Sequence, residues 1–493
     1  VKPQMTQLPL STLLLCGGME SLPVRIGRLS VRLATLACVL ALTGCATYSN
    51  SFGIVEQHLA ERQYDAALQT IEEHSQNQQD RVLYLLNKGM VQRMKRDFAA
   101  SNESLEAAKQ EMERLYAASV SENALSFVVN DATVSYAGDD YEQVLVHLYM
   151  ALNYLELGER DEARVEALQV DAKLREIGED IPASKFTEDA LSRYLSGMIY
   201  EELGEWSDAM IAYRKAYEAY KKYRVNFSVD IPAMLKHDLI RLAQRQGLNE
   251  ELAKYCKEFD IAPPQQDAAP AEPEGELVFI LNSGLAPIKR EHVIGTWAPG
   301  PSVVTDTSKR PPRPLPPRRA AQAVSESTAP PVLVNIALPY YESRPSRIAG
   351  ARISVSGRQA DTQLMEDIDA IARASLSARM PAITARAVAR AISKGVLQEA
   401  VDKSGRQGDD AAVKLLGSLL VRVAAIATER ADTRSWLTLP ANVQLARLPL
   451  PPGSYDVTVE LLGKNGQTIS TEVLPQVVIR KESKTYLTRH TLP

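Results

Sequence analysis

Cysteine is scarce in this sequence, which has four in 493 residues. Cys16, Cys38 and Cys45 lie within or at the end of an N-terminal segment that reads as an export signal, and Cys256 stands far from them. A disulfide framework within the mature chain is therefore not expected. Because its neighbours are apolar at helical spacing, Cys256 is predicted to be a buried thiol on a helix.

Histidines are few as well, and charge of one sign is not in strong excess. No two of the six histidines have metal-ligand spacing, and the motifs His-Glu-x-x-His, Cys-x-x-Cys and Gly-x-Ser-x-Gly are missing. The formal net charge is −5, and no region is strongly basic, so nucleic acid is not an expected partner. The sequence predicts no catalytic residue, no metal site and no cofactor.

Long apolar runs are also rare. The clearest one, Leu33–Leu42, follows three arginines and is about half the ~20 residues that a membrane-spanning helix needs. Leu42-Thr-Gly-Cys45 follows it and resembles the lipobox of bacterial lipoproteins, in which the Cys thiol accepts a diacylglyceryl group. Residues 1–44 are therefore predicted to be a signal peptide, with Met19 as an alternative start, and Cys45 is predicted to be the lipid attachment site.

The residue after the lipobox cysteine is Ala46. In lipoproteins of Gram-negative bacteria an Asp at this position commonly retains the protein in the inner membrane. Ala46 therefore predicts the outer membrane, with the chain on the periplasmic face and the acyl chains as its membrane contact.

Helical periodicity continues from Phe52 to about Asp260. The segment Tyr194–Ala216 resembles the tetratricopeptide pattern, with Gly197 and Ala209 where two helices approach closely and Gly204 at the turn. Residues 45–261 are therefore predicted to form a solenoid of about four repeats with further helices at its end. Such a solenoid presents a concave surface to a protein partner. The small positions that repeat are Ala67, Ser101, Ala163 and Ala209.

The spacing of these small positions indicates an insertion at about Ala117–Gln143. Its end is polar and aromatic, and two interpretations remain open. It is a binding loop, with Asp131, Tyr136, Tyr141 and Glu142 as the candidate partner-binding residues, or it is an ordered turn in which Asp139 or Asp140 caps the next helix.

A Pro/Ala-rich linker at residues 262–274 separates the repeat from residues 275–493. In the latter segment, strands are predicted at Glu276–Leu281, Val332–Leu338 and Ala351–Gly357, and further strands after Leu448. Residues 298–331 form a basic, Pro-rich insert, which is interpreted as a disordered excursion, a PxxP ligand or a contact to an anionic surface.

Three helices are predicted between the two groups of strands: Asp361–Met380, Pro381–Lys394 and Ala411–Ala427. The last is either a buried core helix or a membrane insertion. Asp432, Arg434 and Trp436 follow and form either a polar recognition patch or an ion pair beside a core tryptophan. The predicted fold class is multidomain: an all-α tetratricopeptide-like solenoid followed by an α+β domain.

These pieces together resemble an uncharacterised family of proteobacterial tetratricopeptide-like lipoproteins. The residues that carry the resemblance are the lipobox, the Asn130–Glu142 insert, Asn282–Lys289, Asp432–Trp436 and Leu448–Gly453. Genes of this family often lie beside a lipoprotein that looks like the activator of a penicillin-binding protein. The resemblance therefore implies work in the cell envelope and carries no established activity.

The sequence thus predicts a non-catalytic, periplasm-facing outer-membrane lipoprotein. We expect it to act as a protein-binding scaffold in cell-envelope assembly or peptidoglycan-related processes. The alternatives are a peptidoglycan-acting enzyme and an accessory lipoprotein of a secretion channel or pore.

Overall fold

The structure is a computed structural model that describes residues 52–122, 134–180, 186, 188–263, 274–298, 332–404 and 430–492. By their contacts, the described residues form one compact unit. The chain is about half helical, and a separate sheet-containing region follows the helices. Cys45, Asp131, the insert at 298–331 and the predicted helix at 411–427 lie outside the described residues or, for Ala298, at their edge.

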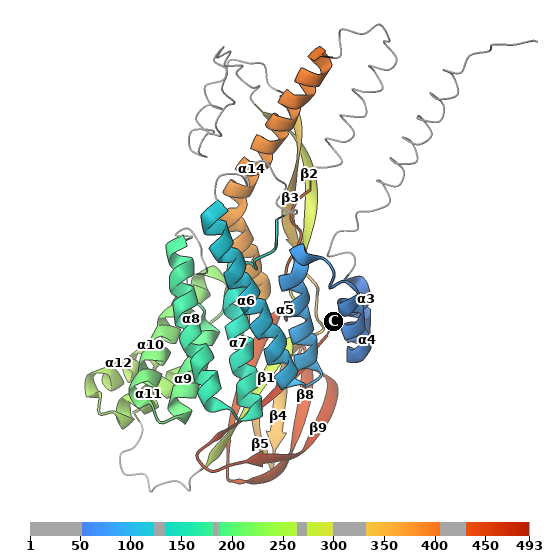
Figure 1. Cartoon of the computed structure of the whole chain (residues 1–493). Coiled ribbons are helices and arrows are strands. Elements are labelled where there is room, and N and C mark those ends of the chain that lie inside the picture. The colour runs from blue at the N-terminus through green and yellow to red at the C-terminus, as the bar shows by residue number, and fades with distance from the viewer. Residues whose placement is uncertain are drawn as a thin grey trace, which may run out of the picture. The chain divides into compact units, whose positions relative to one another are not determined.

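The N-terminal half consists of successive helical hairpins (Figure 1). Five pairs of consecutive helices pack against each other, and neighbouring pairs are also in contact. The helices are α3 (Gly53–Ala60), α4 (Tyr64–Glu73), α5 (Arg81–Met94), α6 (Phe98–Glu122), α7 (Asp140–Leu157), α8 (Arg160–Asp180), α9 (Ala190–Glu202), α10 (Trp206–Asn226), α11 (Ala233–Arg245) and α12 (Asn249–Phe259).

The predicted close approach within a hairpin is confirmed at Gly197 on α9. A Cβ atom built on Gly197 would lie 2.4 Å from the ring of Tyr213 on α10, so no other residue fits without movement. The Tyr213 ring is held in place because its hydroxyl donates to Glu201 Oε2 at 2.8 Å. The turn that follows α9 contains Gly204 at φ +75°, which also matches the repeat pattern.

The described part of the C-terminal half forms three sheets. Sheet A has the strand order β10-β1-β7-β6, sheet B is the pair β2-β3, and sheet C has the order β5-β4-β8-β9. The strands are β1 (Gly275–Ser283), β2 (Ile288–Ala298), β3 (Val332–Glu342), β4 (Ile348–Val355), β5 (Arg358–Asp361), β6 (Gln363–Asp367), β7 (Asn442–Leu450), β8 (Gly453–Gly463), β9 (Thr468–Ile479) and β10 (Lys484–Thr491).

Sheet A lies between the helices and sheet C. Alternate residues of a strand point to opposite faces, and β1 is apolar on both. Val278 and Ile280 belong to the core that includes the helices, whereas Leu277, Phe279 and Leu281 pack with sheet C. This double burial explains why Leu277–Leu281 of β1 is an unbroken apolar run.

The first helices of the central hairpins bond to sheet A and its connecting segments. Tyr149 of α7 donates to Asn282 Oδ1 of β1 at 3.1 Å, and a guanidinium nitrogen of Arg93 on α5 donates to Thr488 of β10 at 2.9 Å. On α9, Tyr194 accepts a hydrogen bond from Arg447 of β7 at 2.7 Å. The chain itself therefore covers the side of the repeat that these helices form.

One prediction about the helices was wrong. Instead of two helices that meet at Pro381, the structure has one helix, α14 (Ile368–Ser404), with Pro381 inside it. Residues 358–367, part of which was assigned to the first helix, form β5 and β6. Proline lacks the N–H that an interior helix position donates, but one missing bond does not end a helix that is supported by packing.

Candidate functional site

The N-terminus of α7 is capped by a reciprocal pair of hydrogen bonds. The side chain of Asp139 accepts from the backbone of Glu142, and Glu142 Oε2 accepts from the backbone N–H of Asp139 at 3.1 Å. This capping box satisfies two of the four N–H groups that a helix start leaves without partners. It also places two carboxylates side by side inside the molecule.

Three elements of the C-terminal half converge on Asp139. Lys289 Nζ of β2 lies 2.9 Å from Asp139 Oδ2, and Arg379 Nη1 of α14 lies 2.9 Å from Oδ1. The hydroxyl of Tyr341 on β3 donates to Oδ2 at 3.3 Å, and Arg379 also pairs with Asp140. We call β2, β3 and α14 the arm. One carboxylate thus contacts all three elements of the arm.

Glu142 is fully buried and its oxygens accept from four donors. Tyr136 donates to Oε2 at 2.6 Å, in addition to the backbone N–H of Asp139. The backbone N–H of Trp436 donates to Oε1 at 2.7 Å, and the hydroxyl of Tyr141 donates to it at 3.3 Å. The Tyr141 hydroxyl also lies 3.3 Å from that of Tyr341. We call this set the joint: Tyr136, Asp139, Tyr141, Glu142, Lys289, Tyr341, Arg379 and Trp436.

The two carboxylates of the joint have opposite pKa shifts. Burial raises the pKa of Glu142 to about 7, and the charge on Asp139 adds to the effect. Burial also acts to raise the pKa of Asp139, but Lys289 and Arg379 outweigh it and hold that pKa below its ordinary value. Asp139 therefore carries a negative charge that both cations of the arm contact.

The structure corrects the hypothesis of a partner-binding loop. Tyr136, Tyr141 and Glu142 are buried and bond within the chain, so in this conformation they present no surface to a partner. The other interpretation, an ordered turn that caps the next helix through Asp139, is confirmed. Asp131 lies outside the described residues.

The segment before β7 forms an ion pair beside a core tryptophan, which is the second of the two interpretations of Asp432, Arg434 and Trp436. Arg434 pairs with Asp432 at 2.7 Å and with Asp80, next to the start of α5, at 3.2 Å, while the Trp436 side chain is buried. Cys256 lies on α12 as predicted and is half-buried rather than buried.

Sequence reasoning missed a second buried pair of carboxyl groups. Asp189 caps α9 by accepting from the N–H of Ser192 at 2.7 Å, and Glu366 lies on β6. Burial raises the pKa of Asp189 to about 6, and burial together with the charge on Asp189 raises the pKa of Glu366 well above its ordinary value. The Asp-x-x-Ser pattern signals the cap, but nothing in the sequence brings β6 to it.

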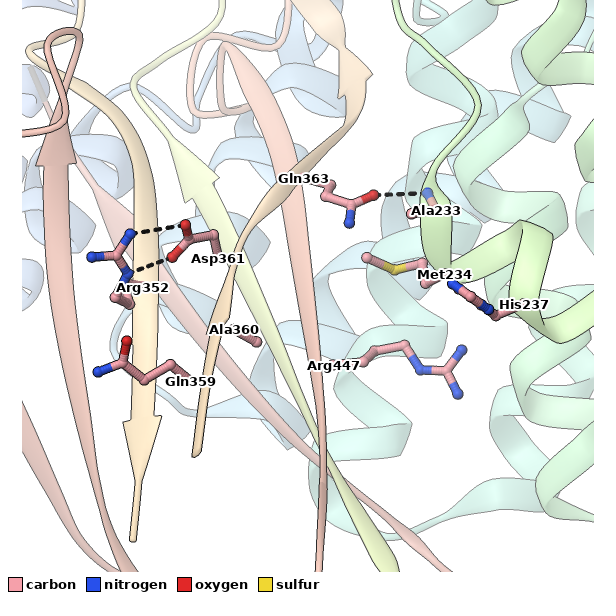
Figure 2. A pocket seen from close by; sticks show the side chains of 9 residues that line it. All are labelled: Ala233, Met234, His237, Arg352, Gln359, Ala360, Asp361, Gln363 and Arg447. Atoms are coloured by element: carbon pink, nitrogen blue, oxygen red, sulfur yellow. Dashed lines mark hydrogen bonds and ion pairs between the residues drawn. The ribbon is translucent and has the colours of Figure 1, made fainter. Parts of the chain in front are cut away.

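A pocket with a volume of about 680 Å³ lies beside α11 (Figure 2). Its charged lining groups are already paired: Arg352 with Asp361 at 2.6 Å, and Arg447 with Glu276 at 2.7 Å. Gln363 accepts from the N–H of Ala233 at 2.9 Å. These pairings leave little free charge to orient a ligand. Ala233, Met234, His237, Gln359 and Ala360 complete the lining.

The residues that the structure describes show no signal of a metal site or of a membrane-spanning helix. No group of three or more His, Cys, Asp or Glu side chains there could hold a metal ion. Within those ranges, too, no helix has the length and apolar character needed to cross a membrane.

The second helices of two hairpins expose apolar side chains. Val165 and Leu168 on α8 are 52% and 45% exposed, and Ile211 on α10 is 46% exposed. We call these three residues the outer patch. Two ion pairs flank it: Arg164–Glu205 at 2.8 Å and Lys215–Asp171 at 3.2 Å. Because Leu168 lies between Arg164 and Asp171 at helical spacing, and Ile211 lies one turn from Lys215, Leu168 and Ile211 face the same surface. Val165 lies three residues before Leu168 on the same helix.

No protein-family model matches the chain, and no curated protein matches it. Two crystal structures of MamA have 15% and 16% identity to it, with TM-scores of 0.27 and 0.28. They cover 43% and 45% of this chain and 93% and 96% of their own. The apo form of RapI has 14% identity and a TM-score of 0.31 over 47% of this chain and 59% of its own.

These neighbours are tetratricopeptide-like proteins. At such low identities and TM-scores they assign neither a partner nor an activity to this chain. The resemblance to a lipoprotein family therefore stays a prediction from the sequence.

Proposed function

We propose that this chain is a non-catalytic lipoprotein scaffold on the periplasmic face of the outer membrane. It binds a protein partner in cell-envelope assembly or peptidoglycan-related processes, and acyl chains on Cys45 anchor it. The observation that carries the binding role is the outer patch on α8 and α10. The inner side of the repeat contacts the chain's own sheet, so the partner uses the outer side.

The outer patch has the character of a recognition surface. Its exposed apolar side chains are flanked by charges of both signs, and exposed apolar groups with a polar rim are typical of protein-binding sites. The ion pairs that join α8 to α10 reduce the movement of one helix against the other. A fixed surface loses less conformational entropy on binding than a mobile one does. The expected partner surface is apolar at its centre.

Photo-crosslinking in the native membrane tests this role. A photoreactive residue replaces Leu168 or Ile211 in the full chain, and Ile469 on β9, which is 43% exposed, serves as the matched control. We expect an adduct of one discrete size from positions 168 and 211 and not from 469. Leu168→Glu should abolish the adduct at 211. Absence of an adduct at both helical positions, or the same adduct at 469, would contradict the proposal.

The lipid anchor needs a separate test. Cys45→Ser should remove acylation, because a hydroxyl is a much weaker nucleophile than a thiolate. Fractionation should then find the chain released from the membrane, and mass spectrometry should find lipid on the N-terminus of the wild type. An unmodified wild-type N-terminus would refute the anchor and leave the binding role open.

A further inference from the structure

Asp189 and Glu366 place two carboxyl groups next to each other in the interior of the protein. Asp189 is the N-cap residue of α9, Glu366 lies on β6, and both residues are fully buried. The two carboxyl groups lie within hydrogen-bonding distance of each other. They meet where the helical repeat contacts β6, which is an edge strand of sheet A.

Each of these carboxyl groups has one oxygen with a donor and one without. Asp189 Oδ1 accepts from the N–H of Ser192 at 2.7 Å, and Glu366 Oε1 accepts from the hydroxyl of Tyr223 on α10 at 3.4 Å. Asp189 Oδ2 and Glu366 Oε2 are buried and have no hydrogen-bond partner among the described groups. Buried polar atoms are normally satisfied, so these two oxygens need a donor.

A proton between the two groups supplies that donor. Ionised carboxylates only accept hydrogen bonds, so two of them in contact repel each other, whereas a protonated carboxyl group donates to its neighbour. Within the described ranges neither group forms an ion pair with a cation, in contrast to Asp139 at the joint. Arg193 on α9 pairs with Asp171 and Glu188 instead. The pair therefore depends on a proton for its stability.

We propose that Asp189 and Glu366 share one proton and form a pH-dependent latch between the helical repeat and sheet A. With the proton in place, the hydrogen bond between the two carboxyl groups holds β6 against the start of α9. When the proton leaves to solvent, two negative charges face each other in a buried site, and β6 separates from α9. The latch contains no residue of the joint or of the outer patch and does not depend on the scaffold role.

The surroundings of the pair support this direction. Burial is the largest cause of the raised pKa of both groups, and the charge on Asp189 adds to it at Glu366. Hydrogen bonds from Ser192 act to lower the pKa of Asp189 but do not outweigh burial. A group with a raised pKa stabilises the fold at low pH and loses that contribution as the pH rises. The other titratable or charged groups around the pair are Glu188 before α9, Arg193 on α9, Tyr220 and Tyr223 on α10, Asp367 on β6 and Tyr149 on α7.

The residues on either side of Glu366 connect the latch to two further helices. The hydroxyl of Tyr220 on α10 donates to the carbonyl oxygen of Met365 at 3.1 Å. Asp367 Oδ1 accepts from the N–H of Ala370 at 2.9 Å, at the start of α14. A movement of β6 therefore reaches the base of the arm.

Hydrogen exchange of the full chain, extracted in detergent and measured by mass spectrometry at pH 5.5, 6.5 and 7.5, tests the latch. The rates are corrected for the intrinsic pH dependence of amide exchange. An opening that releases one proton becomes up to tenfold more frequent for each unit of pH. In the wild type we expect the opening of β6 to rise at least tenfold over this range, and that of β8 in sheet C to change less than twofold.

Two variants keep a hydrogen bond at the latch without the titrating proton. In Glu366→Gln and in Asp189→Asn, the new amide donates to the remaining carboxylate, and Asn is also a favourable N-cap residue. Either variant should remove the pH dependence at β6. Glu188→Gln is the matched control, because it removes a neighbouring carboxylate outside the latch, and it should keep the wild-type dependence.

Two results would overturn the proposal. One is a wild-type chain in which β6 opens equally at all three pH values. The other is a wild-type pH dependence that persists in a folded Glu366→Gln or Asp189→Asn variant.

Discussion

At the scale of single residues, the buried carboxylates of Asp139 and Glu142 differ in the direction of their pKa shifts. Asp139 keeps its charge inside the protein because Lys289 and Arg379 contact both of its oxygens. Glu142 accepts from four donors, and burial together with the charge on Asp139 outweighs Lys289, which acts to lower its pKa. Two neighbouring carboxylates in one capping box therefore favour different protonation states.

This difference predicts a pH dependence of stability. Burial raises the pKa of Glu142 from 4.5 to about 7, so the folded chain holds the proton more tightly than the unfolded chain does. The protonated Glu142 side chain therefore makes its full contribution to the free energy of unfolding below pH 4.5. As the pH rises to 7, this contribution falls by on the order of 3 kcal/mol. Relative to Glu142→Gln, the wild-type free energy of unfolding should fall over that range and level off above it.

Urea unfolding of both proteins at pH 4.5, 5.5, 6.5 and 7.5 checks the prediction. Contributions of the histidines and of the Asp189–Glu366 pair cancel in the difference, because both proteins contain them. A difference that does not change with pH would show that Glu142 titrates normally in the folded chain.

At the scale of elements, short-range sequence patterns predicted most of the helices and strands. They did not predict the contacts between residues that are far apart in the sequence. The helical hairpins follow from periodicity, and the Gly197 position follows from the repeat pattern. Strands β4, β8 and β9 of sheet C follow from alternation and from turns such as the one with Gly466 at φ +76°. The merging of two predicted helices into α14 depends on packing around Pro381, and the joint depends on contacts between residues 139, 289, 341 and 379. No local pattern brings such distant residues together.

The hairpin α9–α10 offers an element-scale prediction. Gly197→Ala should lower the free energy of unfolding by roughly 1–3 kcal/mol, because the new methyl group meets the fixed ring of Tyr213. Gly178→Ala on α8 is the matched control: a Cβ there meets nothing within 4 Å. Since alanine has the higher helix propensity, that change should stabilise the chain by roughly 0.5–1 kcal/mol. Thermal unfolding measures the change in stability of both variants. Equal changes of the same sign would refute the packing argument.

At the scale of the whole molecule, the helical repeat and sheet A share one hydrophobic core. Ile280, Leu445 and Tyr486 of the sheet belong to the same buried cluster as α7 and α9. Polar contacts cross this boundary as well, such as Tyr149 with Asn282. The linker at 262–274 separates the two segments in sequence, but the described elements on either side of it are packed together.

A shared core predicts that helices and sheet unfold together. As urea increases, the amides of α7 and of β1 should lose hydrogen-exchange protection at the same concentration. Ile280→Ala removes a buried side chain from the shared core and should lower both midpoints equally, because the free energy of unfolding falls by roughly 2–5 kcal/mol. Val473→Ala, at an exposed position of sheet C, should change the free energy of unfolding by no more than about 0.5 kcal/mol and leave both midpoints nearly unchanged. If α7 keeps its protection after β1 has lost it, the repeat is stable without the sheet, and the contacts across the boundary only dock two independent domains.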